Sequence, residues 1–525
     1  MGIYVNPGNT AFKEAIHSMI YVDKSRLISY ANRVLNTKQK NLCVSRPRRF
    51  GKSMAADMLV AYYSKGCSSR DLFAGLDIEG DSSFGIHLNQ HEVIRLDMQR
   101  FLETKRDLDT FIDRIEGRVV SELGKEFPEC GEFDGNSRLK DVLDQLFDQT
   151  KRGFVFIIDE WDCVFRMAKD RKDVQKEYLD FLRGLFKGSE YVELAYMTGI
   201  LPIKKYGEHS AINVFDEYSM VDPKNLGKFF GFTGEEVKEQ CRQHGMDYGE
   251  IEKWYDGYQL DGLHIYNPKS VVDALTWKKI KSYWTGTETY EALKVYIDMN
   301  FDGLRETVMM MLGNGRCRVN TRKFQNDMTT FSTKDDVLTL LVHLGYLTFD
   351  ETTEEVYIPN QEIVQEFLNV VDGAGWDGVI QAINRSEQLL QSTWALDEKA
   401  VAEGLETIHN ETASILQYNN ESALTCTILM AYYSAKTYYM NPVMEMPSGK
   451  GFADVVYIPR ANTGKPALVA ELKWDKSARG AIGQIKEKGY TDWIKDYAGD
   501  VLLVGVNYDK RDKVHQCVIE RYQKN

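Results

Sequence analysis

The stretch 45–54, SRPRRFGKSM, constrains the fold of this chain more than any other segment. Its Gly51-Lys52-Ser53 matches the end of the phosphate-binding pattern G-x-x-x-x-G-K-[ST]. A short apolar run, 41–44, precedes it, and apolar residues at helical spacing follow it. A strand, a loop and a helix in this order are typical of a phosphate site at a helix N-terminus. The sequence therefore predicts an α/β domain that binds a nucleotide.

The second half of the loop carries the expected contacts. Gly51 permits close backbone approach, Lys52 reaches the β- and γ-phosphates, and Ser53 ligates Mg²⁺. The cradle of backbone N–H groups depends mostly on 50–53. The nucleotide-binding candidates that border Gly51, Lys52 and Ser53 are Arg49, Phe50 and Met54.

Arg46 stands where the pattern has its first glycine. We expect this change to alter the loop entrance without removing the N–H cradle. Arg46, Arg48 and Arg49 have two interpretations: they add positive charge near the phosphates, or they form a solvated basic turn.

A second segment, GFVFIIDEWD at 153–162, has the features of a buried strand that ends in acids. In an open α/β sheet ligands bind at the carboxyl ends of the strands, which is where Asp159 and Glu160 fall. Asp159 would hold Mg²⁺ through water, and Glu160 would polarise the attacking water. The alternative is an acidic cap between a strand and a helix. A third apolar run, 191–200, ends in Thr198, which is either a sensor of the γ-phosphate or part of a turn.

A second chemical site is predicted in 448–474. Two strands, 454–458 and 467–472, flank a hairpin loop, so that Asp454 begins one strand where Glu471 and Lys473 end the other. Glu471 and Lys473 share one face because strand side chains alternate. Two carboxylates can hold Mg²⁺ or Mn²⁺ with open water positions, and Lys473 can orient the attacking water.

Several stretches together resemble those of bacterial AAA-ATPase-like proteins that carry a C-terminal PD-(D/E)XK nuclease-like domain. The matching stretches are YVDKSRLI (21–28), RPRRFGKSM (46–54), FIIDEWD (156–162), TGILPI (198–203), WYDGYQL (254–260) and IYNPKSVV (265–272). In that family the arginine-rich loop without the first glycine is the usual form. WYDGYQL fits a structural corner better than a site.

The resemblance implies further roles. Asp23 would lie near the nucleotide base. Asp454, Glu471 and Lys473 would be the nuclease motif, with Glu421 as an additional metal-linked glutamate and Gln484 as a polar active-site residue on the following helix.

The resemblance and the pattern together predict three parts. Residues 1–285 would form a three-layer AAA-like P-loop domain with a mostly parallel sheet. Residues 286–385 would form a winged-helix-like connecting module, from a helix at 334–343 and strands at 346–349 and 355–358. Residues 386–525 would form a restriction-endonuclease-like α/β domain with a mixed sheet.

Composition limits the class of protein. A net charge of −13 disfavours a protein that coats nucleic acid with its whole surface, but 450–525 carries 14 Lys and Arg against 10 Asp and Glu. The eight cysteines form no C-x-x-C pair, and the N-terminus lacks a signal-peptide pattern, which favours a reducing cytoplasm. No apolar run reaches the ~18 residues of a membrane span.

The leading hypothesis is an ATPase that gates a Mg²⁺-dependent nuclease acting on DNA or RNA, in bacterial defence or mobile-element control. The alternative is a nucleotide-sensing switch whose nuclease-like domain binds nucleic acid or a partner without cutting. A small-molecule kinase is disfavoured by the second metal site. AAA-type sites often take an arginine from a neighbouring subunit, so a homo-oligomer is an expectation; Arg166, Arg171 and Arg183 follow the acidic strand and are equally well explained as surface charge.

Overall fold

The computed structural model describes residues 2–102, 104, 107–131, 133, 137–203, 213–284, 293–295, 297, 303–324, 331, 333–373, 377–412, 421–448, 451–461, 463–487 and 499–522. The chain divides into two compact units. Unit 1 comprises residues 1–283 and 320–349, and unit 2 comprises 284–319 and 350–525. The predicted division into three domains stays a prediction.

A five-stranded sheet in the order β2-β3-β4-β1-β5 forms the centre of unit 1, and every neighbouring pair in it is parallel. Its strands are β1 (Asn41–Ser45), β2 (Glu92–Asp97), β3 (Phe154–Asp159), β4 (Val192–Gly199) and β5 (Asp216–Tyr218). Because β3 and β4 read as nearly continuous apolar runs, both of their faces are buried.

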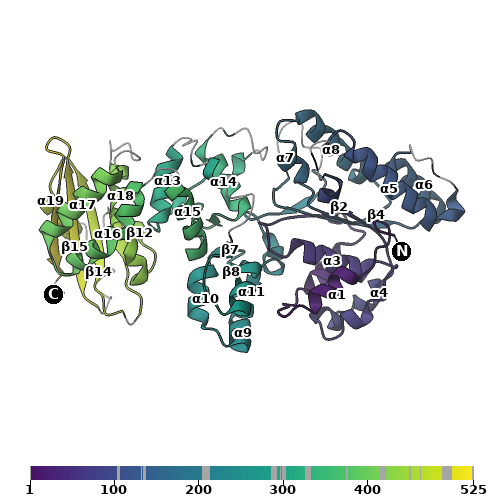
Figure 1. The fold of residues 1–525 in the computed structure, drawn as a ribbon, viewed down its shortest axis with the longest axis horizontal. Coiled ribbons are helices and arrows are strands. Elements are labelled where there is room, and N and C mark those ends of the chain that lie inside the picture. The colour runs from purple at the N-terminus through teal and green to yellow at the C-terminus, as the bar shows by residue number, and fades with distance from the viewer. Residues whose placement is uncertain are drawn as a thin grey trace. The chain divides into compact units, whose positions relative to one another are not determined.

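Helices cover both faces of this sheet, which confirms the predicted three-layer domain. One face packs against α1 (Thr10–Ile16), α2 (Arg26–Val34) and α3 (Lys52–Tyr63). The other packs against α5 (Phe111–Glu126), α6 (Leu139–Thr150), α7 (Cys163–Met167) and α8 (Lys172–Phe186). Figure 1 shows α1 and α3 on the opposite side of the strands from α5, α6 and α8. The short helix α4 (Phe84–His87) lies on the side of α3.

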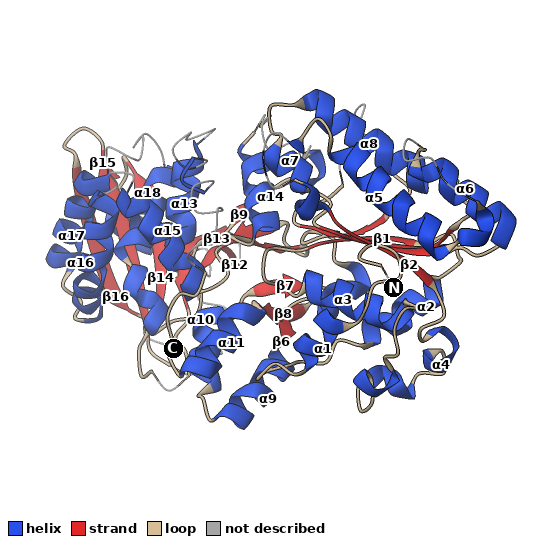
Figure 2. Cartoon of the chain, turned by 45° about the vertical axis from the view of Figure 1, so that its right-hand side comes forward, coloured by secondary structure: helices blue, strands red, loops and turns tan. Residues whose placement is uncertain are grey.

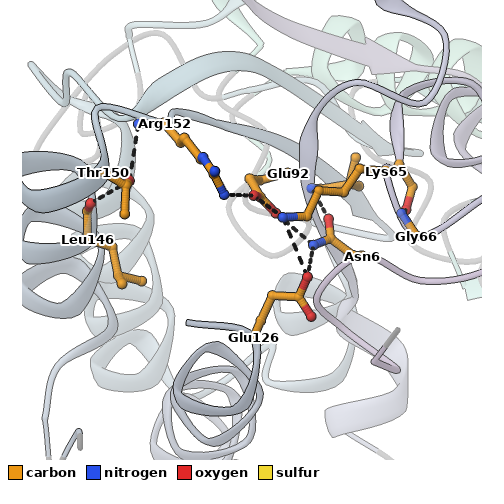
Figure 3. A network of polar contacts seen from close by, with 10 residues as sticks. Asn6, Lys65, Gly66, Glu92, Glu126, Leu146, Thr150 and Arg152 are labelled. Carbon is orange, nitrogen blue, oxygen red and sulfur yellow. Dashed lines mark hydrogen bonds and ion pairs between the residues drawn. The ribbon is translucent and has the colours of Figure 1, made fainter. Parts of the chain in front are cut away.

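A polar network fixes the beginning of β2, at the end of the strand remote from Asp97 (Figure 3). Glu92 is 4% exposed and accepts a hydrogen bond from Asn6 Nδ2 at 2.7 Å. Lys65 forms an ion pair with Glu92 and lies 3.5 Å from a carboxylate oxygen of Glu126. These contacts join the N-terminal segment to the sheet.

Unit 1 also contains a smaller subdomain that follows the parallel sheet in sequence. Its antiparallel sheet, ordered β6-β8-β7, and its helices enclose a separate apolar cluster. The elements are β6 (Phe232–Thr233), α9 (Gly234–His244), α10 (Tyr248–Tyr255), β7 (Tyr258–Leu260), β8 (Leu263–Tyr266) and α11 (Pro268–Trp277). Thr233 and Glu236 form a capping box that starts α9.

The predicted middle module has the expected order of elements. These are α14 (Lys334–Leu344), β10 (Thr348–Asp350), β11 (Glu355–Tyr357) and α15 (Gln361–Gly373). Gly345 ends α14 with φ of 86°, a left-handed conformation that suits glycine. The boundary between the two units falls within β10.

Unit 2 contains a mixed sheet in the order β12-β13-β14-β15-β16, in which only β14 and β15 are parallel. The strands are β12 (Val443–Ser448), β13 (Gly451–Tyr457), β14 (Ala467–Trp474), β15 (Val501–Asp509) and β16 (Val514–Arg521). The helices are α13 (Leu304–Leu312), α16 (Asp377–Trp394), α17 (Glu398–Thr412), α18 (Glu421–Ala431) and α19 (Ala478–Glu487), and a short strand is β9 (Cys317–Arg318). Figure 2 shows the strands of this sheet beside α16 and α17. The predicted mixed sheet is confirmed.

Candidate active sites

The loop between β1 and α3 has the backbone geometry of an anion site. Gly51 has φ of 87°, and an added Cβ there would meet no atom within 4 Å, so the surface over the loop is open. The first N–H groups of α3 have no acceptor within the helix and point out from its N-terminus. Ser53 and Met54, in this first turn, are exposed, with Met54 46% exposed.

Lys52 is buried beneath the loop and bonded to it. Its Nζ donates a hydrogen bond to the carbonyl of Pro47 at 3.0 Å. Burial lowers the pKa of Lys52, while the negative charges of Glu160 and Asp159 act in the opposite direction. The lysine and the two predicted acids therefore belong to one electrostatic site.

Arg46 is buried in the core, so the interpretation of its side chain as part of a solvated turn is wrong, and its contribution of charge near the phosphates stays a prediction. Its Nη1 donates to the carbonyls of Ser45 and Tyr218, each at 2.8 Å, and its guanidinium lies 5.4 Å from the centre of the Phe230 ring. Its backbone N–H bonds to the carbonyl of Gly199 at 3.0 Å. Burial lowers its pKa to about 10. Arg46 thus fastens the ends of β1, β4 and β5 together.

Arg49 differs from Arg46, because its side chain is exposed. Its φ is 69°, and its Nη1 donates to the carbonyl of Tyr283 at 2.8 Å. The nucleotide contact predicted for Arg49 stays a prediction.

Phe50 anchors the loop through its side chain. The ring is fully buried and meets the ring of Tyr258 edge-on, with centroids 5.2 Å apart. The carbonyl of Phe50 accepts a hydrogen bond from the N–H of Gly231 at 3.1 Å. Tyr258 belongs to WYDGYQL, and its hydroxyl bonds to the carbonyl of Gly345 at 2.7 Å. These contacts support the interpretation of that motif as a structural corner.

Asp159 and Thr198 meet at the ends of adjacent strands. The strand order places β4 between β1 and β3, so Thr198 lies between the loop and Asp159. The Thr198 hydroxyl donates to Asp159 Oδ1, which also accepts the N–H of Glu160 at 3.0 Å. Asp159 is 3% exposed, and Asp97 is its register partner on β2. The structure brings these two predicted residues together.

Glu160 is held by Arg166, a contact that sequence reasoning missed. Arg166 Nη2 forms an ion pair with Glu160 Oε2, and only 16% of the Arg166 side chain is exposed. Burial raises the pKa of Glu160 against the opposing charges of Arg166 and Lys52. The spacing i, i+4 between Asp162 and Arg166 was the available signal.

The other two arginines considered as fingers are surface residues. The Arg171 side chain is 43% exposed and pairs with Asp109 and Asp173. That of Arg183 is 44% exposed and pairs with Asp180. Surface charge is therefore wrong for Arg166, whereas for Arg171 and Arg183 both the finger and the surface-charge interpretation stay predictions.

Asp23 connects two local elements. Its Oδ1 accepts the N–H of Ser25 at 2.7 Å, before α2, and its Oδ2 accepts the N–H of Asp77 at 2.6 Å. Its predicted place near a nucleotide base stays a prediction.

In unit 2, β13 and β14 bring Asp454 and Glu471 to the same level of the sheet. Val455 pairs with Ala470, and the two acids are the next residue on each strand. Asp454 Oδ2 accepts the N–H of Leu472 at 2.6 Å. These contacts confirm the predicted antiparallel approach.

Glu471 is the centre of this site. Its Oε1 accepts hydrogen bonds from Lys473 Nζ at 2.7 Å and from Gln484 Nε2. Glu471 is 1% exposed and Lys473 is 8% exposed, so the pair is shielded from water. The structure therefore joins three of the predicted residues through direct contacts.

Gly505 allows α19 to approach the sheet, and sequence reasoning missed it. It is the register partner of Glu471, and an added Cβ would come 2.4 Å from the carbonyl oxygen of Ala478. A glycine within an apolar strand was the available signal. The close approach carries Gln484 of α19 to Glu471.

The donor set fits a hard divalent cation only in part. Asp454 and Glu471 offer the oxygen ligands that Mg²⁺ and Mn²⁺ prefer. Glu421 begins α18, but its side chain lies outside the described residues. Among the side chains that the structure does describe, no group of three or more His, Cys, Asp or Glu is placed to hold a metal.

Comparison with protein families finds one match in each unit of the chain. Residues 8–207 match the family described as "Predicted AAA-ATPase", and residues 419–517 match the PD-(D/E)XK nuclease superfamily. The chain therefore carries an AAA-ATPase-like domain followed by a domain of the PD-(D/E)XK nuclease superfamily, as the resemblance implied.

One curated relative is an uncharacterized protein in the vnfD 5′ region of Azotobacter chroococcum mcd 1, 26% identical over 486 residues, which are 89% of each chain. Among solved structures, a Walker-type ATPase of Pyrococcus abyssi covers 66% of this chain and 94% of its own, with 13% identity and a TM-score of 0.31. The ORC2 protein of Aeropyrum pernix covers 69% and 92%, with 11% identity and a TM-score of 0.28. In the described part of the chain, no helix has the length and apolar character needed to cross a membrane.

Proposed function

We propose that this protein binds and hydrolyses ATP in unit 1 and uses that reaction to gate a Mg²⁺-dependent phosphodiester cleavage in unit 2. The observation that carries the proposal is the buried Glu471 carboxylate. It accepts hydrogen bonds from Lys473 and Gln484, and the register of β13 and β14 places Asp454 next to it. A buried acid, an ammonium and a second acid on two adjacent inner strands of a sheet suit phosphodiester hydrolysis.

In unit 1, the N–H groups at the start of α3 would bind the phosphates, with Lys52 leaving the Pro47 carbonyl to contact them. Ser53 and Asp159 would hold Mg²⁺, which neutralises phosphate charge when bound. Glu160 would accept a proton from the attacking water, and Thr198 fixes the orientation of Asp159 through its hydrogen bond.

In unit 2, Asp454 and Glu471 would hold the Mg²⁺ or Mn²⁺, with Glu421 as the candidate third ligand. A bound cation lowers the pKa of water and stabilises the charge of the phosphodiester transition state. Lys473 orients the water, and Gln484 keeps the Glu471 carboxylate in place. Nucleic acid, DNA or RNA, is the substrate class.

The proposed setting is a bacterial cytoplasm, in defence or mobile-element control, with homo-oligomerisation through the ATPase domain. The eight cysteines are dispersed along the chain and form no C-x-x-C pair, which supports a reducing compartment.

The experiment is cleavage of a panel of duplex DNA, single-stranded DNA, structured RNA and tRNA with Mg²⁺ or Mn²⁺, with and without ATP. We expect cutting to be lost in Glu471→Ala and altered in Lys52→Ala. Glu520→Ala is the matched control, because Glu520 lies in the same sheet but pairs with Lys486 at the surface. Equal cutting by wild type and Glu471→Ala would contradict the proposal.

A second candidate is a nucleotide-sensing switch whose nuclease-like domain binds without cutting. Internal contacts favour it: Asp454 is bonded to the N–H of Leu472, and Glu471 to Lys473. No cutting of any substrate, together with ATP hydrolysis that requires Lys52, would support this candidate, as would an Asp454→Ala variant with unchanged biological effect.

A further inference from the structure

Both the side chain and the backbone of Glu160 are held in an unusual way. Arg166 Nη2 binds Glu160 Oε2, whereas Oε1 accepts no hydrogen bond from the described part of the chain. Glu160 has φ of 54°, an uncommon conformation for a residue other than glycine. Since strained residues persist only where their surroundings fix them, the position of this acid is determined by its neighbours.

Arg166 is in turn fixed by Asp162, which is fully buried. Arg166 Nε lies 3.6 Å from Asp162 Oδ2. The same oxygen accepts the backbone N–H groups of Ile200 and Leu201, at 3.2 and 2.9 Å. Both amides follow directly after β4. The arginine is thus held by the segment that leaves the strand of Thr198.

Gly199 makes this arrangement sterically feasible. An added Cβ there would come 2.7 Å from Asp162 Oδ1 and 2.6 Å from the Trp161 ring. The N–H of Trp161 also bonds to the carbonyl of Thr198 at 2.9 Å. The acidic turn after β3 and the end of β4 therefore form one packed unit around Arg166.

We propose that Arg166 is a positioning residue that aims Glu160 at the attacking water and couples it, through Asp162, to the segment after β4. The inference rests on the proposed ATP hydrolysis. The guanidinium occupies one carboxylate oxygen and leaves the other to accept a proton. Its charge is balanced by Glu160 and Asp162 of its own chain, so its partner in the free protein is the acid and not a neighbouring subunit.

The test is a double-mutant cycle with Arg166→Gln, Glu160→Gln and the double variant, measured for ATP hydrolysis and for thermal unfolding. We expect Arg166→Gln to lower kcat at least about tenfold with KM within about twofold, because the interaction acts in the chemical step. In the Glu160→Gln background the same substitution should change kcat less than about twofold. Arg166→Lys should recover part of the loss. Arg171→Gln is the matched control, because its ion pairs lie at the surface.

Thermal unfolding tests the contact between Glu160 and Arg166 independently of ATP hydrolysis. The double variant should be destabilised less than the sum of the single variants. Additive unfolding would overturn the Glu160–Arg166 contact. A full loss of kcat from Arg166→Gln in the Glu160→Gln background would overturn the positioning role and indicate direct action on the phosphate. If wild type shows no hydrolysis that depends on Lys52, the proposed function itself fails, and the inference fails with it.

Discussion

The two candidate sites are assembled in different ways. Lys52, Asp159 and Thr198 come from distant parts of the sequence and meet only because β4 lies between β1 and β3. Asp454, Glu471 and Lys473 come from two neighbouring strands of one hairpin. The first site therefore depends on the order of a whole sheet, whereas the second depends on the register of one strand pair.

The sites also differ in what fixes their side chains. In unit 1, Arg46 and Arg166 are largely buried guanidinium groups that bond to strand ends and to acids. In unit 2, Glu471 is fixed by a lysine and an amide. If this contrast holds, substitution of Arg46 in unit 1 should act mainly on the fold, whereas substitution of Gln484 in unit 2 should act mainly on cleavage.

The largest expected effect is on stability, from restoring the glycine of the loop pattern. Arg46→Gly removes two hydrogen bonds and leaves a cavity, and we expect it to lower the free energy of unfolding by roughly 2–5 kcal/mol. Urea unfolding, with hydrogen exchange read in β1 and β4, measures the loss.

Arg49→Gly is the control for that substitution. Arg49 is exposed and has φ of 69°, so glycine is tolerated and stability should stay within about 1 kcal/mol of wild type. An Arg46→Gly variant as stable as wild type would remove the contrast between the two sites.

Acid should weaken unit 2 through two buried histidines. His409 and His515 are 7% and 6% exposed, and their rings lie 5.1 Å apart. Burial lowers the pKa of His409 to about 4 and, with the neighbouring His409, that of His515 to about 3. The unfolded chain binds both protons near its ordinary pKa of about 6.5, so it binds more protons than the folded chain below that pH.

Stability should therefore fall as the pH drops from about 6.5 towards 4, with a slope of up to about 1.4 kcal/mol per pH unit for each histidine. Hydrogen exchange of α17 and β16 at pH values across this range measures the loss of stability. His409→Gln should make stability depend less steeply on pH. His264→Gln, at a side chain that is 59% exposed, is the control. A slope unchanged in His409→Gln would contradict the prediction.

The sequence predicted the parts of each site that follow from local pattern. Gly51, Lys52 and Asp159 could be placed because apolar runs define strands whose carboxyl ends meet. Asp454, Glu471 and Lys473 could be placed because strand side chains alternate.

What could not be predicted depends on packing between elements. The burial of Arg46 requires Phe230 and Tyr218, and nothing in SRPRRFGKSM shows that one arginine points inward. The Glu160–Arg166 pair requires the turn after β3 to fold back on itself. Such contacts are set by tertiary structure, which overrides local charge patterns.

The smallest expected effect tests the comparison between the two sites most sharply. It comes from removing a single hydrogen bond, from the Gln484 amide to Glu471 Oε1. Gln484→Ala removes the amide but leaves Lys473 on Glu471 Oε1. Losing one hydrogen bond to a charged acceptor should cost about 1.4 kcal/mol, or about tenfold in cleavage, with ATP hydrolysis unchanged. Gln516→Ala, an exposed glutamine of β16, should cleave as wild type does. If Gln484→Ala also cleaves at the wild-type rate, the amide from α19 is not needed to hold Glu471 in its active position.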